Sequence, residues 1–320
     1  MITLNKRRIK WDKIFLFSII LVLLITFIIS TINIIKWLVD SKEANKNIEQ
    51  VQEQTDIIEI EDSTNTEVIE PIEIKKEDPY WDYIKMNLID VNFNELKEKN
   101  DSTIGWIQVN GTNINYPFVQ TTDNDFYLNH TFNKSHNSSG WVFMDYRNNK
   151  DDFDKNTIIY AHGRLNNVMF GSLRKVLTNG WLNNKENHVI KLSTENENTL
   201  WQAFSVYRIP TTSDYIQVKF NDSYEFLEFG NLLLKRSAYN FGTNINENDK
   251  ILTLSTCYND NDKVVLHAKL IKREKKVITK QQDTPNINKD EIIKSVMNTI
   301  DDQKKHILSR IISKFINKKN

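Results

Sequence analysis

Residues 251–257 read ILTLSTC, and the polar turn YNDND (258–262) separates them from KVVLHAKLI (263–271). Apolar side chains recur at every second position in both runs, a period that predicts two β-strands. Two strands joined by a short polar turn predict an antiparallel hairpin. Cys257 ends the first strand and Lys263 begins the second, so we expect these two residues to face each other across the hairpin.

Similar short runs precede this hairpin. They are rich in β-branched and aromatic residues and are bounded by turn residues: GWIQV (105–109), NINYPFVQ (113–120), GWVFMDY (140–146), NTIIYAH (156–162) and HVIKLS (188–193). This pattern predicts a mainly β domain, closed or sandwiched, over residues 79–273. The stretch 223–239 has apolar residues at mixed helical spacing, which predicts a helix inserted between strands. PYWDYI (79–84) predicts an amphipathic helix with proline in its first turn.

An apolar segment lies near the N-terminus. Residues 14–35 (IFLFSIILVLLITFIISTINII) carry no charge. As a helix they extend about 33 Å, enough for a bilayer core of about 30 Å. A cleaved signal peptide is the alternative, but its apolar core is shorter and ends at a small-residue cleavage site, which IKWLV (35–39) lacks. Lysines and arginines crowd residues 1–13, so we expect a transmembrane anchor over 14–39, a cytoplasmic N-terminus and an extracellular catalytic domain.

The two segments outside the domain are polar. Residues 40–78 are rich in acidic residues, and their isolated isoleucines form no sustained stripe, which predicts a flexible stalk. A coiled coil is a weaker interpretation, because no heptad persists. Residues 274–320 are basic with a late helical pattern and predict a partly helical tail. A basic amphipathic helix on an anionic membrane or polymer is the alternative for this tail.

Composition excludes several classes of protein. The chain has 320 residues, 42 Lys and Arg, 42 Asp and Glu, and therefore no formal net charge, so no global field indicates a nucleic-acid partner. A single cysteine excludes an intramolecular disulfide framework and a cysteine-rich zinc site. No His, Cys and carboxylate grouping has metal-ligand spacing, and we expect neither a metal nor another cofactor.

Cys257 is a candidate nucleophile. A lone cysteine is more often a small buried hydrophobe. Cys257, however, ends a strand, precedes a polar turn, and lies in a segment expected outside the cell, where an unpaired exposed thiol is a liability unless it is used.

His162 is the candidate general acid and base. It ends the run TIIYA (157–161) and precedes Gly163, a turn position that exposes the ring. The alternative is an ordinary surface histidine, and His267 is the rival nearest to Cys257 in sequence. Lys263 can place a cation beside the sulfur, which favours thiolate and stabilises an oxyanion. Its own alternative is a solvated hairpin lysine.

These motifs together resemble the sortases, membrane-anchored cysteine transpeptidases of Gram-positive-type bacteria. The pair LSTC (254–257) and YAHG (160–163) carries the resemblance. Class B in particular is indicated by GWI (105–107), GTNINYP (111–117), DN (123–124) with YL (127–128), DYRN (145–148) and MFGSL (169–173). The resemblance covers residues 80–272. It implies an eight-stranded β-barrel with an N-terminal helical extension and an inserted helix before the cysteine strand.

The resemblance also implies a mechanism. Cys257 would attack the carbonyl of a sorting-signal threonine, of LPxTG or NPxTG type, and release the glycine side as a thioacyl enzyme forms. His162 would protonate the leaving amine and then deprotonate an incoming amine of a peptidoglycan cross-bridge or of a pilin. The family's third residue is an arginine at the position of Lys263. Lysine keeps the charge but lacks the planar fork, which predicts weakened or altered catalysis.

We predict roles for four further residues. The residue before the cysteine lies beside the thioester carbonyl in the family, which makes Thr256 a candidate for the oxyanion site. Ser255 is a weaker candidate and is otherwise a plain strand residue. Arg147 is expected to belong to a structural ion pair. Arg164 and Arg273 do not match the position of the family's arginine, but Arg164 is near enough to His162 in sequence to supply a guanidinium from the neighbouring loop.

Three functions remain open at this point. The first is a class B-like transpeptidase acting on surface proteins or pilins. The second is a thiol peptidase that passes the acyl group to water, since the same Cys–His pair permits both reactions. The third is an impaired module that binds sorting signals, an alternative that depends on Lys263. The 208–224 loop and the inserted helix are expected to set the shape of the recognition groove.

Overall fold

The computed structural model describes residues 11–257 and 261–276. The basic N-terminal flank and most of the basic tail, residues 277–320, lie outside the described residues. The helices of the described part are α1 (Trp11–Glu53), α2 (Tyr80–Tyr83), α3 (Asn94–Lys99), α4 (Asn179–Leu182), α5 (Ser223–Arg236) and the 3-10 helices η1 (Phe126–Leu128), η2 (Phe170–Leu177) and η3 (Lys185–Asn187). The strands are β1 (Ile57–Ile60), β2 (Thr66–Val68), β3 (Leu88–Val91), β4 (Thr103–Val109), β5 (Asn115–Val119), β6 (Phe143–Met144), β7 (Asn156–Tyr160), β8 (Val189–Thr194), β9 (Glu197–Pro210), β10 (Ile251–Cys257) and β11 (Asp262–Lys275).

Eight strands close into a barrel, as expected. Their order is β10-β7-β6-β5-β4-β8-β9-β11, and β11 pairs back with β10. The β10–β7 and β5–β6 pairs are parallel and the other pairs in the ring are antiparallel. Closure satisfies the hydrogen-bonding edges that an open sheet would expose.

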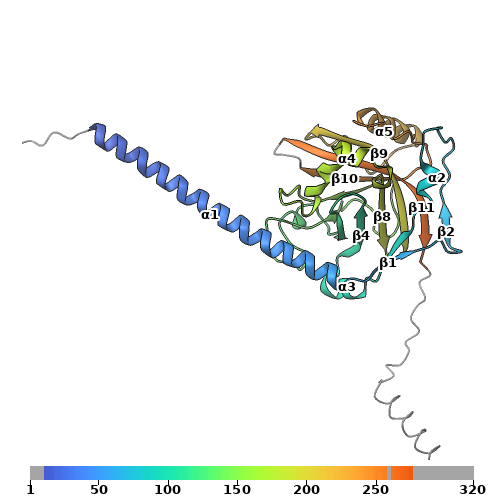
Figure 1. Ribbon diagram of the computed structural model, residues 1–320, viewed down its shortest axis with the longest axis horizontal. Helices are drawn as coiled ribbons and strands as arrows, with labels where there is room; N and C mark the ends of the chain where they lie inside the picture. The colour runs from blue at the N-terminus through green and yellow to red at the C-terminus, as the bar shows by residue number, and fades with distance from the viewer. Residues whose placement is uncertain (1–10, 258–260, 277–320) are drawn as a thin grey trace, which may run out of the picture. The chain divides into compact units, whose positions relative to one another are not determined.

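The alternating apolar residues of hairpin β10–β11 pack into two different cores. Leu252, Leu254 and Leu266 join the main core inside the barrel. Ile251 and Val265 join a second core on the outer side, where α5 contributes Phe226 and Phe229. Figure 1 shows α5 beside β9, and this is the inserted helix that was expected before the cysteine strand. Its first turn is capped by the Asp222 side chain, which accepts a hydrogen bond from the Glu225 amide.

The 14-residue strand β9 was not predicted. Eleven consecutive positions, 197–207, are buried, because the barrel interior covers one face and α5 or the N-terminal elements cover the other. A strand buried on both faces loses the alternation that identifies a strand from sequence. The helix expected from residue 79 is only the single turn α2.

The flexible stalk expected over residues 40–78 is not what the structure contains. α1 continues without a break to Glu53, β1 pairs with β3, and β2 pairs with β11. Ala44, Ile48 and Val51 are buried at helical spacing, and this short stripe is what holds the end of α1 in place. The apolar part of α1 makes this helix long and apolar enough to cross a membrane.

Candidate functional site

The parallel pairing of β7 with β10 brings the histidine and cysteine segments together. The register runs from Asn156 opposite Ile251 to Tyr160 opposite Ser255. Two residues further along each segment lie His162 and Cys257. The strand contact persists beyond the ladder, since the Thr256 hydroxyl donates a hydrogen bond of 2.8 Å to the carbonyl of Ala161. The backbone positions of His162 and Cys257 therefore lie at the same end of adjacent segments.

The antiparallel pairing of β10 with β11 brings in the lysine. Cys257 is directly opposite Lys263, and the register continues through Leu254 opposite Leu266. The predicted hairpin and the predicted pairing of these two residues are confirmed. Three neighbouring strands, β7, β10 and β11, thus deliver the three candidate catalytic positions to one end of the barrel.

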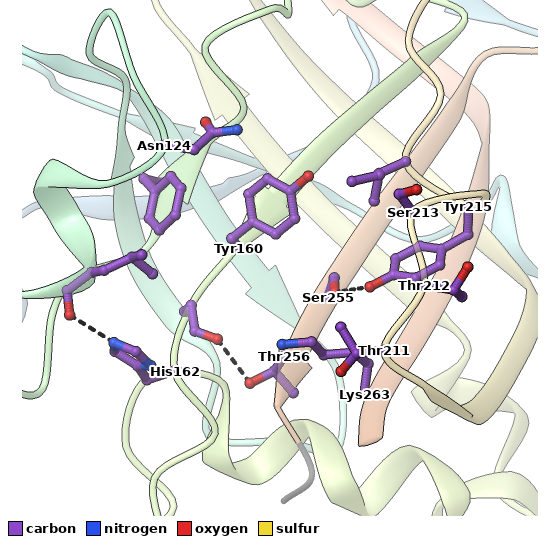
Figure 2. A pocket seen from close by; sticks show the side chains of 14 residues that line it. Asn124, Tyr160, His162, Thr211, Thr212, Ser213, Tyr215, Ser255, Thr256 and Lys263 are labelled. Carbon is purple, nitrogen blue, oxygen red and sulfur yellow. Dashed lines mark hydrogen bonds between the residues drawn. The ribbon is translucent and has the colours of Figure 1, made fainter. Parts of the chain in front are cut away.

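A cavity of about 580 Å³ opens at this end. Its walls come from the four strands β6, β7, β10 and β11, from residues just after β7, from the loop after β9, and from residues before and within η1. The lining residues are Asn124, Leu128, Phe143, Tyr160, Ala161, His162, Thr211, Thr212, Ser213, Tyr215, Ile216, Ser255, Thr256 and Lys263. Figure 2 shows His162 on one side of Thr256 and Lys263 on the other, with the amine end of Lys263 directed toward Thr256.

The orientation of His162 is fixed by one hydrogen bond. Its Nε2 lies 2.6 Å from the carbonyl oxygen of Leu128, and because a carbonyl can only accept, Nε2 carries the proton. The lone pair of the neutral ring is then on Nδ1. Gly140 packs on the ring edge at a positive φ of 60°, and a Cβ there would lie 2.5 Å from the Tyr127 carbonyl oxygen. A side chain at position 140 would therefore displace the wall that supports His162.

The electrostatic environment keeps this imidazole neutral. Burial lowers the pKa of His162 below its usual value, and the positive charges of Arg164 and Lys263 lower it further. The hydrogen bond to Leu128 opposes these effects but does not cancel them. At neutral pH the ring is therefore a base with a free Nδ1, and its protonated form is a minority species.

The two candidate hydroxyls of β10 are already engaged. The Thr256 hydroxyl donates its hydrogen bond to the Ala161 carbonyl, so it is not a free donor for an oxyanion in this state. The Ser255 hydroxyl lies 2.9 Å from the hydroxyl of Tyr215, across the cavity wall. Both residues line the cavity, but their hydrogen bonds join them to other wall residues, Ala161 and Tyr215.

Residues 211–222, between β9 and α5, form the wall opposite His162 and are tied to the barrel. The Asn156 side chain donates to the Gln217 carbonyl at 2.8 Å, and Arg147 donates to the Ile216 carbonyl at 3.0 Å. Arg147 also holds the fully buried Asp145 through Nε at 2.9 Å and Nη2 at 2.6 Å, which confirms the expected structural ion pair. Burial alone would raise the pKa of Asp145, but the hydrogen bonds from Arg147 and Tyr160 and the charge of Arg147 bring it below its usual value.

His267 is excluded as the catalytic histidine by its surroundings. It is completely buried on β11 between two side-chain partners. Thr253 donates its proton to Asn156, so the Thr253 oxygen accepts from His267 Nδ1, and the Tyr207 hydroxyl donates to Nε2. Both ring nitrogens are thus satisfied in the neutral form, and burial lowers the pKa of His267 to about 3.

Three other histidines have structural surroundings. His188 is buried, with Nε2 bonded to the Leu182 carbonyl, and His130 stacks on Phe126. His136 forms a β-bridge with His130. None of the three lines the cavity around His162.

Arg164 does not supply a guanidinium to this cavity. Its Nη2 donates to the Ser41 hydroxyl of α1 at 2.9 Å, its Nη1 donates to the Ser138 carbonyl at 3.3 Å, and its guanidinium lies over the Trp37 ring. Arg273 pairs with Glu197 at the opposite end of β11. Lys263 is therefore the cationic residue that lines this cavity.

The sequence does not identify several of the wall residues. Leu128, Tyr160 and Tyr215 line the cavity but lie 42 or more residues from Cys257 in the chain, and only the barrel topology brings them close. The sequence analysis expected the 208–224 loop and the inserted helix to shape the groove. The loop does line the cavity, through Thr211, Thr212, Ser213, Tyr215 and Ile216, whereas no residue of α5 is among the described lining residues.

Comparison with known proteins gives consistent matches. The family model described as Sortase domain matches residues 107–271. Sortase B of Staphylococcus aureus is 28% identical over 264 residues, which cover 81% of this chain and 98% of that protein. The crystal structure of sortase B from Bacillus anthracis in complex with AAEK1 superimposes with a TM-score of 0.57 at 29% identity, covering 73% of this chain and 99% of that one. The Staphylococcus aureus sortase B–substrate complex gives a TM-score of 0.53 at 33% identity, covering 56% and 84%.

Proposed function

The chain belongs to the sortase family of cysteine transpeptidases and is similar to sortases B, and from that premise we propose that it is a membrane-anchored enzyme that transfers surface proteins to an amine acceptor. The proposed substrate is a C-terminal sorting signal of LPxTG or NPxTG type, cut between threonine and glycine. The proposed nucleophile is Cys257. The observation that supports the assignment is the convergence of β7, β10 and β11, which brings the Cys257 backbone to the same end of the barrel as His162 and directly opposite Lys263.

The first half-reaction forms a thioester. The sulfur of Cys257 attacks the threonine carbonyl carbon, and the carbonyl oxygen becomes an oxyanion. Collapse of this intermediate breaks the Thr–Gly amide bond, and the leaving nitrogen takes a proton from His162. Because the pKa of His162 is lowered, the reactive thiolate–imidazolium pair is a minor species at neutral pH. We therefore expect a modest kcat that depends on pH.

The second half-reaction transfers the acyl group. An amine attacks the thioester carbonyl, neutral His162 takes a proton from the amine, and the thiolate of Cys257 leaves. The proposed acceptors are the amine of a peptidoglycan cross-bridge and the lysine of a pilin. The cavity of about 580 Å³ gives the acyl segment a site between His162 and the 211–222 loop.

Lys263 is the proposed source of positive charge for the oxyanion. It lines the same cavity as His162, and its charge already acts on the imidazole. An ammonium is a point charge without the planar fork of arginine, so it stabilises the oxyanion with one group rather than two. Because Lys263 stands where the family has an arginine, a catalytically impaired protein that binds sorting signals is the second candidate function.

Location follows from α1 under this proposal. The apolar segment anchors the protein in the cell membrane, with the basic N-terminal flank in the cytoplasm and the barrel outside. No nucleic-acid partner, metal or other cofactor is required for this chemistry. The amine acceptors and the surface-protein substrates are all extracellular.

Intact-mass measurement separates the candidate functions. The full chain is incubated in detergent with LPxTG- and NPxTG-type peptides, with and without an amine. We expect a thioacyl adduct and an amine-dependent ligated product for the wild type, and neither for Cys257→Ala or His162→Ala.

Hydrolysed peptide without ligation, at any amine concentration, would instead indicate a thiol peptidase. Peptide that binds but stays intact would indicate the binding function. A matched control is His136→Ala, which removes an exposed histidine that does not line the cavity, and should behave as the wild type.

A further inference from the structure

The loop that follows His162 displays an unusual residue. Leu165 is 80% exposed, among the most exposed large hydrophobic side chains in the described residues. The loop is not loosely held. Gly163 and Met169 form a β-bridge that closes it, and the Asn167 amide donates to the Arg164 carbonyl at 3.2 Å. The structure thus holds an apolar side chain outward on a constrained support.

The base of this loop is fixed as well. Arg174 donates to the Gly163 carbonyl at 2.9 Å, and the Phe170 amide donates to the His162 carbonyl at 3.1 Å. Gly171 packs so closely on the Arg164 carbonyl oxygen that a Cβ there would lie 2.0 Å from it. Only glycine permits that approach. The exposure of Leu165 is therefore a property of a defined loop conformation.

The same loop contacts α1 at a definite height. Arg164 bonds to Ser41 and lies over the ring of Trp37. The uncharged segment of α1 ends at Ile35. At 1.5 Å per residue, Trp37 lies about 3 Å and Ser41 about 9 Å beyond that end along the helix axis. The headgroup layer on each side of a bilayer is roughly 5–7 Å thick, so Trp37 lies within this layer and Ser41 just beyond it. Arg164, which contacts both residues, is therefore at the outer part of the layer.

The chemistry of these residues suits that layer. Tryptophan is enriched at membrane interfaces, and arginine places its charge at headgroup level while its stem contacts apolar groups. An exposed leucine next to such a pair has a favourable environment in the boundary between headgroups and acyl chains. Lys36, also exposed on α1, adds a second cation at this height.

We propose that the loop of residues 163–168 is a membrane-contact surface, in which Leu165 enters the headgroup layer of the bilayer that α1 spans and Arg164 lies at phosphate level. The partner is a phospholipid surface. This inference rests on the proposed membrane anchoring of α1. It places the segment that carries the candidate catalytic histidine against the membrane, at the level where any membrane-held substrate leaves the lipid.

The test uses single-cysteine reporters in the full chain, with Cys257→Ala removing the natural thiol. An environment-sensitive fluorophore is attached at Leu165→Cys, at Ile25→Cys in the middle of the span, or at Tyr224→Cys. Tyr224 is the matched control, because it is a large side chain that is 69% exposed but lies on α5. The protein is reconstituted in phosphatidylcholine and phosphatidylglycerol vesicles that contain either headgroup-level or deep acyl-chain quenchers.

We expect the label at 165 to be quenched by the headgroup-level quencher, the label at 25 by the deep quencher, and the label at 224 by neither. If the label at 25 is quenched and the label at 165 behaves as the one at 224, the membrane-contact inference is wrong while the anchor stands. If the label at 25 is not quenched, the anchoring proposal fails and takes the inference with it.

A length change in α1 gives an independent readout. A polar seven-residue helical insertion between Ile35 and Lys36 preserves the helical phase to about 20°. It raises everything after it by about 10 Å and leaves all contacts of Arg164 in place. Quenching at 165 should fall to the level at 224, with quenching at 25 unchanged. Quenching at 165 that survives this insertion would overturn the proposal.

Discussion

Lys263 faces Cys257 across the final hairpin, and this residue pair was predictable from sequence because a short polar turn fixes the register of a hairpin. The hydrogen bonds of His162 and Thr256 were not predictable in the same way. Their partners, the carbonyls of Leu128 and Ala161, are backbone atoms of segments that only the folded barrel brings into contact. A sequence gives residue types and their spacing along the chain, and neither indicates a hydrogen bond to the backbone carbonyl of a distant segment.

The lysine should set the rate of acyl-enzyme formation. Lys263→Ala should lower kcat/KM by about 10²–10³, the effect of removing one oxyanion partner. Lys263→Arg should raise it above the wild type, because the guanidinium fork contacts the oxyanion with two donors. Lys263→Met, of similar length but uncharged, separates charge from shape. Rapid-quench measurement of the thioacyl species decides, and unchanged kinetics in Lys263→Ala would contradict the assignment.

The buried His267 should make stability depend on pH. Its folded pKa of about 3 lies below the usual 6.5, so the unfolded state binds a proton between these values while the folded state does not. The contribution to stability is complete above pH 6.5 and is lost as pH falls, with a slope of up to about 1.4 kcal/mol per pH unit. Urea denaturation between pH 7 and 4 measures it. His267→Gln should be less stable at pH 7 but show a flatter profile, whereas the exposed His136→Gln should keep the wild-type slope.

At the level of elements, burial pattern decided what could be predicted. Hairpin β10–β11 was recognisable, although both of its faces meet a core, because its apolar residues alternate and a polar turn joins its two strands. β9 was missed because both of its faces are covered and its buried positions include polar residues. Gln202 donates a hydrogen bond to Asp78, which precedes α2, and Ser205 donates one to the Leu233 carbonyl of α5. The end of α1 was mistaken for a stalk because three buried residues, Ala44, Ile48 and Val51, are too few to form a recognisable stripe.

The 211–222 loop should govern substrate affinity. Arg147→Lys keeps the charge beside Asp145 but loses the fork that also reaches the Ile216 carbonyl. We expect KM for the signal peptide to rise several-fold with kcat nearly constant, because the loop forms a wall of the cavity and does not touch the proposed reacting atoms. Steady-state kinetics with the amine in excess measures both. Lys97→Met, which breaks a surface ion pair with Glu195, is the control, and a fall in kcat alone would contradict this role.

For the molecule as a whole, helix α1 and the candidate site are connected by hydrogen bonds. Asp40 accepts hydrogen bonds from the Ser138 amide and hydroxyl, and Ser41 accepts one from Arg164. Ser138 precedes Gly140, which packs on His162, and Arg164 follows His162 by two residues. The end of α1 therefore supports both sides of the histidine. The eight-stranded architecture was predictable through family resemblance, but this connection was not, because it depends on contacts between residues about a hundred positions apart.

Disturbing the helix contact should reach the chemistry. Ala44→Arg forces a large side chain into a completely buried position, an overpacking that costs about 1–3 kcal/mol. We expect a lower melting temperature and a lower kcat, with KM nearly unchanged, because the support of His162 is displaced while the 211–222 loop is not. Lys46→Arg, an exposed change two residues along the same helix, is the control. A variant with full kcat would show that the histidine holds its position without α1.

The parallel pairing of β7 with β10 also governs when the site comes into existence. The paired residues are 95 positions apart, from Asn156 opposite Ile251 onward. Pairings of such long sequence separation form late in folding, because the intervening chain must first be ordered. Under the proposed function, the positions of Cys257 and His162 thus stay apart in a new chain until the last two strands have closed the ring. Under the same proposal, acylation is therefore expected only from the folded barrel and not from the chain while it folds.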